Sequence, residues 1–251
     1  MKIVYWKKPP TELKLLDNEA HLWLVNLKIA TEELEQLTNT LSTDERVRAD
    51  RFKFEEHRNR FIAARGYLRQ ILSSYLQKPS KGKGDSRIIP TFEYSDRGKP
   101  KLPNTNLQFN VSHSQDIALY SITKNNLIGI DIEYLRSNVE CSKIAERFFN
   151  GIEYRIINNL SQDKQARTFF QFWTMKEAYL KATGEGLGGG LETVKIELNC
   201  NLEAEVKAIA NNEVKSNNWF FESFIPQKDF VASVAINTEG TSLEIKYYTL
   251  N

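Results

Sequence analysis

Two carboxylates stand two residues apart in the segment Ile128-Gly129-Ile130-Asp131-Ile132-Glu133. Successive side chains of a β-strand point to opposite faces. A strand here would send the three isoleucines into a core and place Gly129, Asp131 and Glu133 together on the other face. Neighbouring carboxylates repel each other unless a cation lies between them, and oxygen ligands suit Mg²⁺ or Mn²⁺. The segment is a candidate metal site, although a half-exposed strand with a solvated acidic face has the same pattern.

A second candidate lies in the segment 173–182, where Trp173, Glu177 and Lys181 recur every four residues. In a helix these three side chains would form one stripe. The simplest interpretation is a surface salt bridge between Glu177 and Lys181, contributing about 0.3–0.5 kcal/mol. The functional interpretation is a third carboxylate ligand followed one turn later by a lysine that binds phosphate. The segment taken alone does not separate the two.

The third candidate is Ser112-His113-Ser114, at the end of an expected strand over 107–114. A histidine between two hydroxyl groups can donate to a phosphate oxygen. Taken alone, a satisfied polar residue at a strand end is the better interpretation.

Basic residues gather between positions 46 and 69. A local basic region suits a small phosphorylated ligand or an acidic protein partner. For the arginines at 58, 65 and 69, which lie on one helical stripe, a solvated basic face is the favoured interpretation, and contacts between the helix and a sheet are the alternative. The eight basic residues are Arg46, Arg48, Arg51, Lys53, Arg58, Arg60, Arg65 and Arg69.

The candidate residues need a scaffold, and the periodicity predicts one. Long helices are expected over about 55–77 and 163–182, and each is followed by short strands separated by turns. The order of elements permits two similar α/β halves, 1–125 and 126–251, which meet near residue 125 and place the acidic strand at their junction. Ser42 and Glu45 fit a capping box, which predicts a further helix start at Ser42.

The composition is that of an ordinary soluble globular protein, with 41% hydrophobic and 26% charged residues and a formal net charge of +2. This charge gives no support to a nucleic-acid role. Two cysteines and three histidines lack the spacing of a zinc site. No apolar run approaches 18 residues, so neither a membrane span nor a signal peptide is expected, and a reducing cytoplasm is the expected location.

In this order, the three candidate segments resemble the Sfp-type 4′-phosphopantetheinyl transferases. The family pattern has a strand ending in S-H-S, a G-x-D-x-E strand and a W-x-x-K-E-x-x-x-K helix. All three are intact, and the family's G-K-P turn is present at 98–100. The resemblance spans about residues 42–187. It implies an α+β fold with two similar halves related by a pseudo-twofold, each a small, mostly antiparallel sheet packed with a long helix, in a monomer.

The resemblance also implies an activity. Members of the family transfer 4′-phosphopantetheine from coenzyme A to a serine of an apo acyl carrier protein or peptidyl carrier domain, and release adenosine 3′,5′-bisphosphate. By this likeness Asp131, Glu133 and Glu177 would bind Mg²⁺, with Mn²⁺ as an alternative. Glu177 would take the serine proton, either directly or through a water on the metal, and Lys181 would neutralise charge on the diphosphate.

The likeness extends to the rest of the coenzyme A site. Ser112 and His113 would hold phosphate oxygens, and His113 is counted with Glu177 and Lys181 as catalytic. Lys99 would support the nucleotide end. Arg48 and then Arg51 are the candidates for the 3′-phosphate. Glu45 stands where some relatives carry a further lysine. The segment after Gly151, expected to be an apolar loop, is the candidate docking region for the carrier protein.

Two other functions are compatible with parts of the pattern. A metal-dependent phosphatase or nuclease would use the acidic pair for hydrolysis without a carrier protein, but the order of the three motifs argues against it. A non-enzymatic binding module is opposed by the intact set of Asp131, Glu133, Glu177 and Lys181. The sequence leaves open which carrier proteins and which pathway are served, and whether acyl-coenzyme A is accepted.

Overall fold

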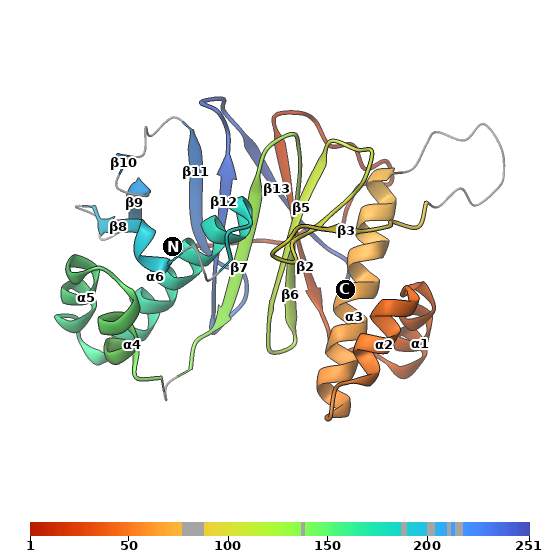
Figure 1. Ribbon diagram of the computed structural model, residues 1–251, viewed down its shortest axis with the longest axis horizontal. Helices are drawn as coiled ribbons and strands as arrows, with labels where there is room; N and C mark the ends of the chain where they lie inside the picture. The colour runs from red at the N-terminus through yellow and green to blue at the C-terminus, as the bar shows by residue number, and fades with distance from the viewer. Residues whose placement is uncertain (77–87, 137–138, 187–189, 200–203, 210–211, 214–217) are drawn as a thin grey trace.

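The computed structural model describes residues 1–76, 88–136, 139–186, 190–199, 204–209, 212–213 and 218–251. The elements form four layers, in which two sheets face each other at the centre and helices cover the outer face of each sheet (Figure 1). The loop expected over 78–86 lies outside the described residues.

The first sheet has the strand order β13-β2-β6-β5, antiparallel except between β13 and β2. Helix α3 packs on its outer face through a core that includes Trp23, Tyr67 and Tyr120, and α1 and α2 lie against α3. The elements are α1 (Thr31–Thr40), α2 (Thr43–Asp50), α3 (Glu55–Leu76), β2 (Glu19–Asn26), β5 (Leu107–Ser114), β6 (Ile117–Lys124) and β13 (Glu244–Thr249). A small hairpin of β3 (Glu93–Tyr94) and β4 (Pro100–Lys101) carries the Gly98-Lys99 turn.

The second sheet has the order β1-β11-β12-β7, in which only the β1–β11 pair is parallel. Helix α6 packs on its outer face through a core that includes Phe172 and Val231. The elements of this half are β1 (Lys2–Ile3), β7 (Ile128–Tyr134), α4 (Cys141–Phe148), α5 (Gly151–Asn158), α6 (Gln162–Thr183), the 3₁₀ turn η2 (Leu191–Thr193), β8 (Val194–Leu198), β9 (Ala204–Ile209), β10 (Asn212–Glu213), β11 (Trp219–Ile225) and β12 (Phe230–Asn237). Strands β8, β9 and β10 form a separate small sheet.

The inner faces of the two sheets share a third core, which contains Leu22 and Leu119 from one sheet and Ile130 and Val234 from the other. Each half consists of a four-stranded, mostly antiparallel sheet and a helix of 22 residues. The expected α+β class with two similar halves is confirmed. The terminal strands cross over: β1 joins the sheet of the second half and β13 joins the sheet of the first.

Two sequence-based expectations are wrong. The segment after Gly151 is helix α5 and not a loop, because Asn150 and Glu153 form a capping box at its start. The arginine stripe of α3 is not a solvated face throughout, since Arg65 and Arg69 turn inward onto Glu45. Arg58 alone keeps the expected partly exposed position, beside Asp50. Among the described helices, none combines the length and the apolar character needed to cross a bilayer.

Candidate active site

Strands β5 and β7 meet where the two sheets adjoin, and polar side chains connect them. The Asn110 amide oxygen accepts from the backbone N–H of Ile130 at 3.0 Å. The Ser112 hydroxyl donates to Asp131 Oδ1 at 2.8 Å, and the Ser114 hydroxyl donates to Glu133 Oε2 at 3.2 Å. The period of two along each strand makes this ladder, because alternate side chains of β5 face alternate side chains of β7. The S-H-S motif therefore contacts the acidic strand through its serines.

Helix α6 approaches β7 very closely at Gly129. A Cβ atom at this position would lie 2.0 Å from the carbonyl oxygen of Ala178 and 2.4 Å from the nitrogen of Ala182. Glycine is the residue that permits such an approach. Glu177 and Lys181 each immediately precede one of these alanines, so the close approach brings their stripe over the acidic face of β7.

Lys181 is the cation of the cluster. Its ammonium group donates to Asp131 Oδ1 at 2.6 Å and to the Ser112 hydroxyl at 2.8 Å. The lysine is thus engaged with β7 and β5, and the interpretation of a simple surface salt bridge with Glu177 is wrong.

The remaining carboxylates are held in an environment that disfavours negative charge. Burial raises the pKa of Glu177 to about 7, with the charges of Asp131 and Glu133 adding to the effect. Burial and the charge of Asp131 raise the pKa of Glu133 as well. A carboxyl group with a pKa near 7 can exchange a proton at neutral pH, which is what a general base requires.

Two buried oxygens in this cluster, Asp131 Oδ2 and Glu177 Oε1, have no hydrogen-bond partner. A buried oxygen of an acid is costly unless something positive meets it, and the charge and hardness of these donors suit Mg²⁺. In the part of the chain that the structure describes, no three His, Cys, Asp or Glu side chains already form a group that could hold a metal ion. Asp131 and Glu177 fit the cation as oxygen donors, and Glu133 is engaged with Ser114.

His113 points to the other side of β5, the side that Phe109 shares with the core beneath α3. Desolvation lowers the pKa of His113, and the positive charges of Lys181 and Arg60 act in the same direction. An anion placed between these cations would reverse the effect.

Lys99 in the Gly98-Lys99-Pro100 turn reaches the end of α6. Its ammonium group donates to the carbonyl oxygen of Ala182 at 2.6 Å, and burial lowers its pKa to about 8. The helix ends just beyond, at Gly184, which adopts φ +79°. The turn thus lies one residue from Lys181 along α6, and a single helix terminus joins the two lysines.

Arg48 and Arg51 lie apart from this cluster, on the exposed surface of α2. They line a groove of about 940 Å³ together with Val47 and Phe52. The Arg48 guanidinium stands over the ring of Phe61, 5.3 Å from its centroid. The structure therefore brings together the residues of β5, β7, α6 and the β3–β4 turn, and leaves the two arginines at a second location.

A sequence model of the 4′-phosphopantetheinyl transferase superfamily matches residues 127–235, which include the acidic strand and α6. The 4′-phosphopantetheinyl transferase HetI of Nostoc sp. is 38% identical over 97% of this chain and 98% of its own length. The chain belongs to the 4′-phosphopantetheinyl transferase superfamily. Sfp of Bacillus subtilis is 30% identical to this transferase over 68% of the chain and 72% of its own length. A crystal structure of Helicobacter pylori holo-[acyl-carrier-protein] synthase with coenzyme A covers 44% of the transferase and 99% of that chain, at 20% identity and a TM-score of 0.35.

The family and the Sfp-type expectation made from the motifs agree. The transferase is an enzyme that modifies carrier proteins with 4′-phosphopantetheine, and coenzyme A is the substrate that donates the group.

Sequence reasoning gave no role to several residues that shape the transferase site. Ser114 was named only as part of the S-H-S motif. Ser114 and Asn110 bond β7 directly, and their spacing of two around Ser112 was the available signal. Lys176 is fully buried, where it donates to Glu153 Oε1 at 2.9 Å and to two backbone carbonyls near η2. Trp173 contacts the ring of Phe169 with 5.8 Å between centroids.

Proposed function

We propose that the transferase binds the diphosphate of coenzyme A at the cluster of Asp131, Glu177 and Lys181 and transfers 4′-phosphopantetheine to a serine of an apo carrier protein, acyl or peptidyl. The observation that carries this proposal is the arrangement of Lys181 beside two partnerless acid oxygens. A diphosphate needs a cation at its oxygens, and the acceptor serine needs a base.

The chemistry assigned to the chain's own residues is as follows. The serine oxygen forms a bond to the phosphorus that bears pantetheine, and the bond from that phosphorus to the bridging oxygen breaks. The serine proton goes to Glu177, directly or through a water on the bound ion. Lys181 neutralises charge that develops on the leaving adenosine 3′,5′-bisphosphate.

Asp131, Glu133 and Glu177 are the proposed ligands of Mg²⁺ or Mn²⁺. The bound ion would supply further charge neutralisation to the diphosphate oxygens. Asp131 Oδ1 already accepts from Lys181, so Oδ2 is the oxygen that the aspartate has available. Ser114 holds Glu133 by a single hydrogen bond of 3.2 Å, which is weak enough to be exchanged.

The first half, residues 1–125, is proposed to contact the nucleotide end, and the second half, residues 126–251, to supply the acids and Lys181. Ser112 and His113 would hold phosphate oxygens from β5. Lys99 would face the nucleotide, and Arg48 and Arg51 the 3′-phosphate. The crossing of β1 and β13 links the halves within one chain, which supports a monomer.

The test is a mass measurement. The purified protein is incubated with coenzyme A, Mg²⁺ and a panel of apo carrier proteins, and each carrier is weighed. We expect a gain of one phosphopantetheine group per carrier, which EDTA abolishes and added Mg²⁺ restores. Transfer that persists in excess EDTA would refute the metal assignment. A failure to bind coenzyme A at all would refute the proposed site.

A further inference from the structure

We infer that Glu45 is a positioning residue for the nucleotide end of coenzyme A. It would act by holding together the two elements that carry Arg48, Arg51 and Lys99. The inference rests on the proposed function of those three residues and adds a residue that does not itself touch the substrate.

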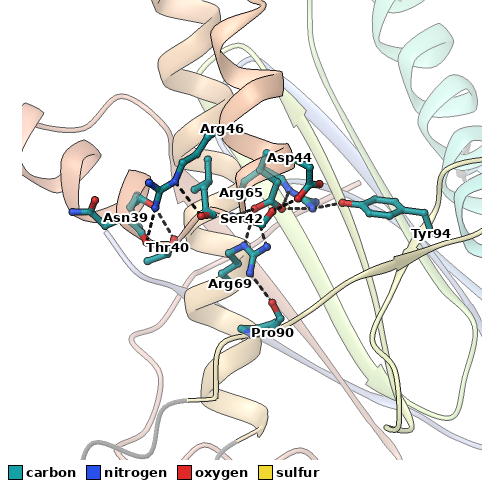
Figure 2. A network of polar contacts seen from close by, with 12 residues as sticks. Asn39, Thr40, Ser42, Asp44, Arg46, Arg65, Arg69, Pro90 and Tyr94 are labelled. Atoms are coloured by element: carbon teal, nitrogen blue, oxygen red, sulfur yellow. Dashed lines mark hydrogen bonds and ion pairs between the residues drawn. The ribbon is translucent and has the colours of Figure 1, made fainter.

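Glu45 is a buried carboxylate that forms ion pairs with two arginines of α3. Its Oε1 accepts from Arg65 Nε at 2.8 Å and forms an ion pair with Arg65 Nη2 at 2.6 Å. Its Oε2 accepts from Arg69 Nε at 2.8 Å and from the backbone N–H of Ser42 at 3.0 Å, and it forms an ion pair with Arg69 Nη2 at 2.8 Å. Figure 2 shows the two arginines reaching from α3 to the start of α2. With 3% of its surface exposed, Glu45 cannot be a ligand of the nucleotide.

The same arginines hold the segment that leads into the β3–β4 turn. Arg65 Nη2 donates to the Tyr94 hydroxyl at 2.9 Å, and Arg69 Nη1 donates to the carbonyl of Pro90 at 2.6 Å (Figure 2). Both guanidinium groups stand over the ring of Phe92, 4.8 and 5.1 Å from its centroid. Tyr94 belongs to β3, which pairs with β4 across the turn that contains Lys99.

Glu45 provides the buried ion pairs that attach α2 to α3, beside the more exposed pair of Asp50 with Arg58 and the packing of Ala49 on Ile62. Of its eight residues only Glu45 and Ala49 are buried, and Arg48 and the residue after the helix, Arg51, lie at the surface. A short helix of this kind depends on tertiary contacts for its stability. The capping box and the ion pairs of Glu45 supply both its start and its attachment to α3.

The two elements adjoin each other. Asp44 lines the groove that contains Arg48 and Arg51. It also lines a second pocket, of about 420 Å³, with Phe92 and Tyr94. A ligand that extends from the arginines of α2 to the turn of Lys99 would pass this point, so a displacement of either element would misplace its contacts. A buried carboxylate that pairs with two arginines, one on each oxygen, holds the elements that carry these side chains in a fixed arrangement.

The test uses Glu45→Gln, which keeps the shape of the side chain and removes its charge. We expect the KM for coenzyme A to rise about tenfold or more, as is usual when an outer supporting residue is lost, with kcat at saturating coenzyme A within about threefold of wild type. The affinity for adenosine 3′,5′-bisphosphate, measured by calorimetry, should fall by the same factor as the KM rises.

The matched control is Glu19→Gln. Glu19 is also buried in the first half and also binds basic partners, Lys246 and His21, but it contacts neither α2 nor the β3–β4 hairpin. It should lose stability without a change in KM. If the two variants show the same KM, or if Glu45→Gln lowers kcat and leaves KM unchanged, the inference is wrong.

If Glu45→Gln does not fold, Tyr94→Phe provides the second test, because it removes only the link between Arg65 and the hairpin. We expect a KM increase of about two- to threefold with kcat unchanged, and an unchanged KM would refute the inference. Absence of transfer by the wild-type protein would instead refute the proposed function, so the two failures are distinguishable.

Discussion

The ammonium group of Lys181 lies in contact with an acid of β7 and a hydroxyl of β5, although its own helix offers Glu177 four residues earlier. The close approach at Gly129 makes the β-strand carboxylate the nearer partner. At the scale of residues, the site thus consists of one lysine, three acids and two serines arranged by a single helix–strand contact.

Replacement of Lys181 by methionine should abolish most of the transfer. The variant keeps the length and packing of the side chain and loses the charge, so we expect kcat to fall about 10²–10³-fold with the melting temperature little changed. Lys164→Met, at an exposed lysine near the start of the same helix, is the control and should be fully active. Activity within tenfold of wild type would remove Lys181 from the chemistry.

Replacement of Glu177 by glutamine should abolish transfer and at the same time raise the free energy of unfolding at alkaline pH. The pKa of Glu177 is raised from 4.5 to about 7, so the folded state binds a proton that the unfolded state releases between these pH values. Stability is therefore lost as the pH rises through this window, and the variant escapes that loss. Without divalent cations, we expect it to be more stable than wild type by about 1 kcal/mol at pH 8, after allowance for partial solvent exposure.

The stability that Glu177→Gln gains over wild type should decrease as the pH falls toward 4.5. Transfer should be lost at all pH values. Urea unfolding at several pH values measures the first effect, and carrier mass the second. A variant less stable than wild type at pH 8 would contradict the raised pKa.

At the scale of elements, α6 is the piece that the site depends on. One of its faces meets β7 at Gly129, and another carries Lys176 into a buried pair with Glu153. Glu153 also caps α5 and accepts from the backbone N–H of Ile196 in β8 at 2.7 Å. The same helix therefore joins β7 to the outer layer of α5 and β8.

Gly129→Ala should disturb the helix–strand contact. The added methyl group meets backbone atoms that cannot rotate away, so we expect a loss of about 1–3 kcal/mol or more in unfolding free energy together with reduced transfer. Gly151→Ala is the matched control, because a Cβ there meets nothing within 4 Å. Equal stability of the two variants in denaturant titrations would show that the approach is looser than described.

The buried pair of Lys176 and Glu153 should behave as a unit. Lys176→Met breaks the pair and leaves a charged carboxylate in the interior. We expect the free energy of unfolding to fall by about 3–5 kcal/mol. The double variant Lys176→Met with Glu153→Gln should recover part of that loss, because no uncompensated charge remains. Additive losses in a double-mutant cycle would show that the two side chains do not depend on each other.

At the scale of the whole molecule, two similar halves share a central core, and each contributes a terminal strand to the other's sheet. This exchange explains why the site can span both halves, since the sheets are fixed to each other by more than side-chain packing. A buried polar chain supports the first sheet: the indole of Trp23 donates to the Tyr75 hydroxyl, which donates to His21 Nδ1, and His21 Nε2–H donates to Glu19.

The hydrogen-bonded chain from Trp23 to Glu19 should make the free energy of unfolding depend on pH in the acid range. Burial lowers the pKa of His21 to about 4, so the unfolded state takes up a proton near pH 6.5 while the folded state resists it. Stability should therefore fall as the pH drops from 6.5 to 4, by up to about 3 kcal/mol. His21→Gln should have a flatter profile in urea unfolding over this range. An identical slope in both proteins would assign the acid sensitivity to other groups.

The sequence alone determined the chemistry and the class of fold. Local periodicity predicts the acidic strand at 128–133, the stripe of Glu177 and Lys181 and the two long helices. The side chains of a strand or a helix repeat with a fixed period that does not depend on tertiary contacts. The motifs, taken in order, were sufficient to indicate the family, and the three isoleucines entered the core as expected.

Only the tertiary structure decided which partners these residues meet. The bond from Lys181 to Asp131, the inward turn of Arg65 and Arg69 onto Glu45 and the exchange of β1 and β13 all join residues far apart in the chain. Helical spacing placed the arginines on one stripe, but whether that stripe meets water or a buried carboxylate depends on a different helix. Long-range contacts of this kind leave no periodic signal in the sequence, and for that reason the stripe predicted to be solvated became the attachment of α2.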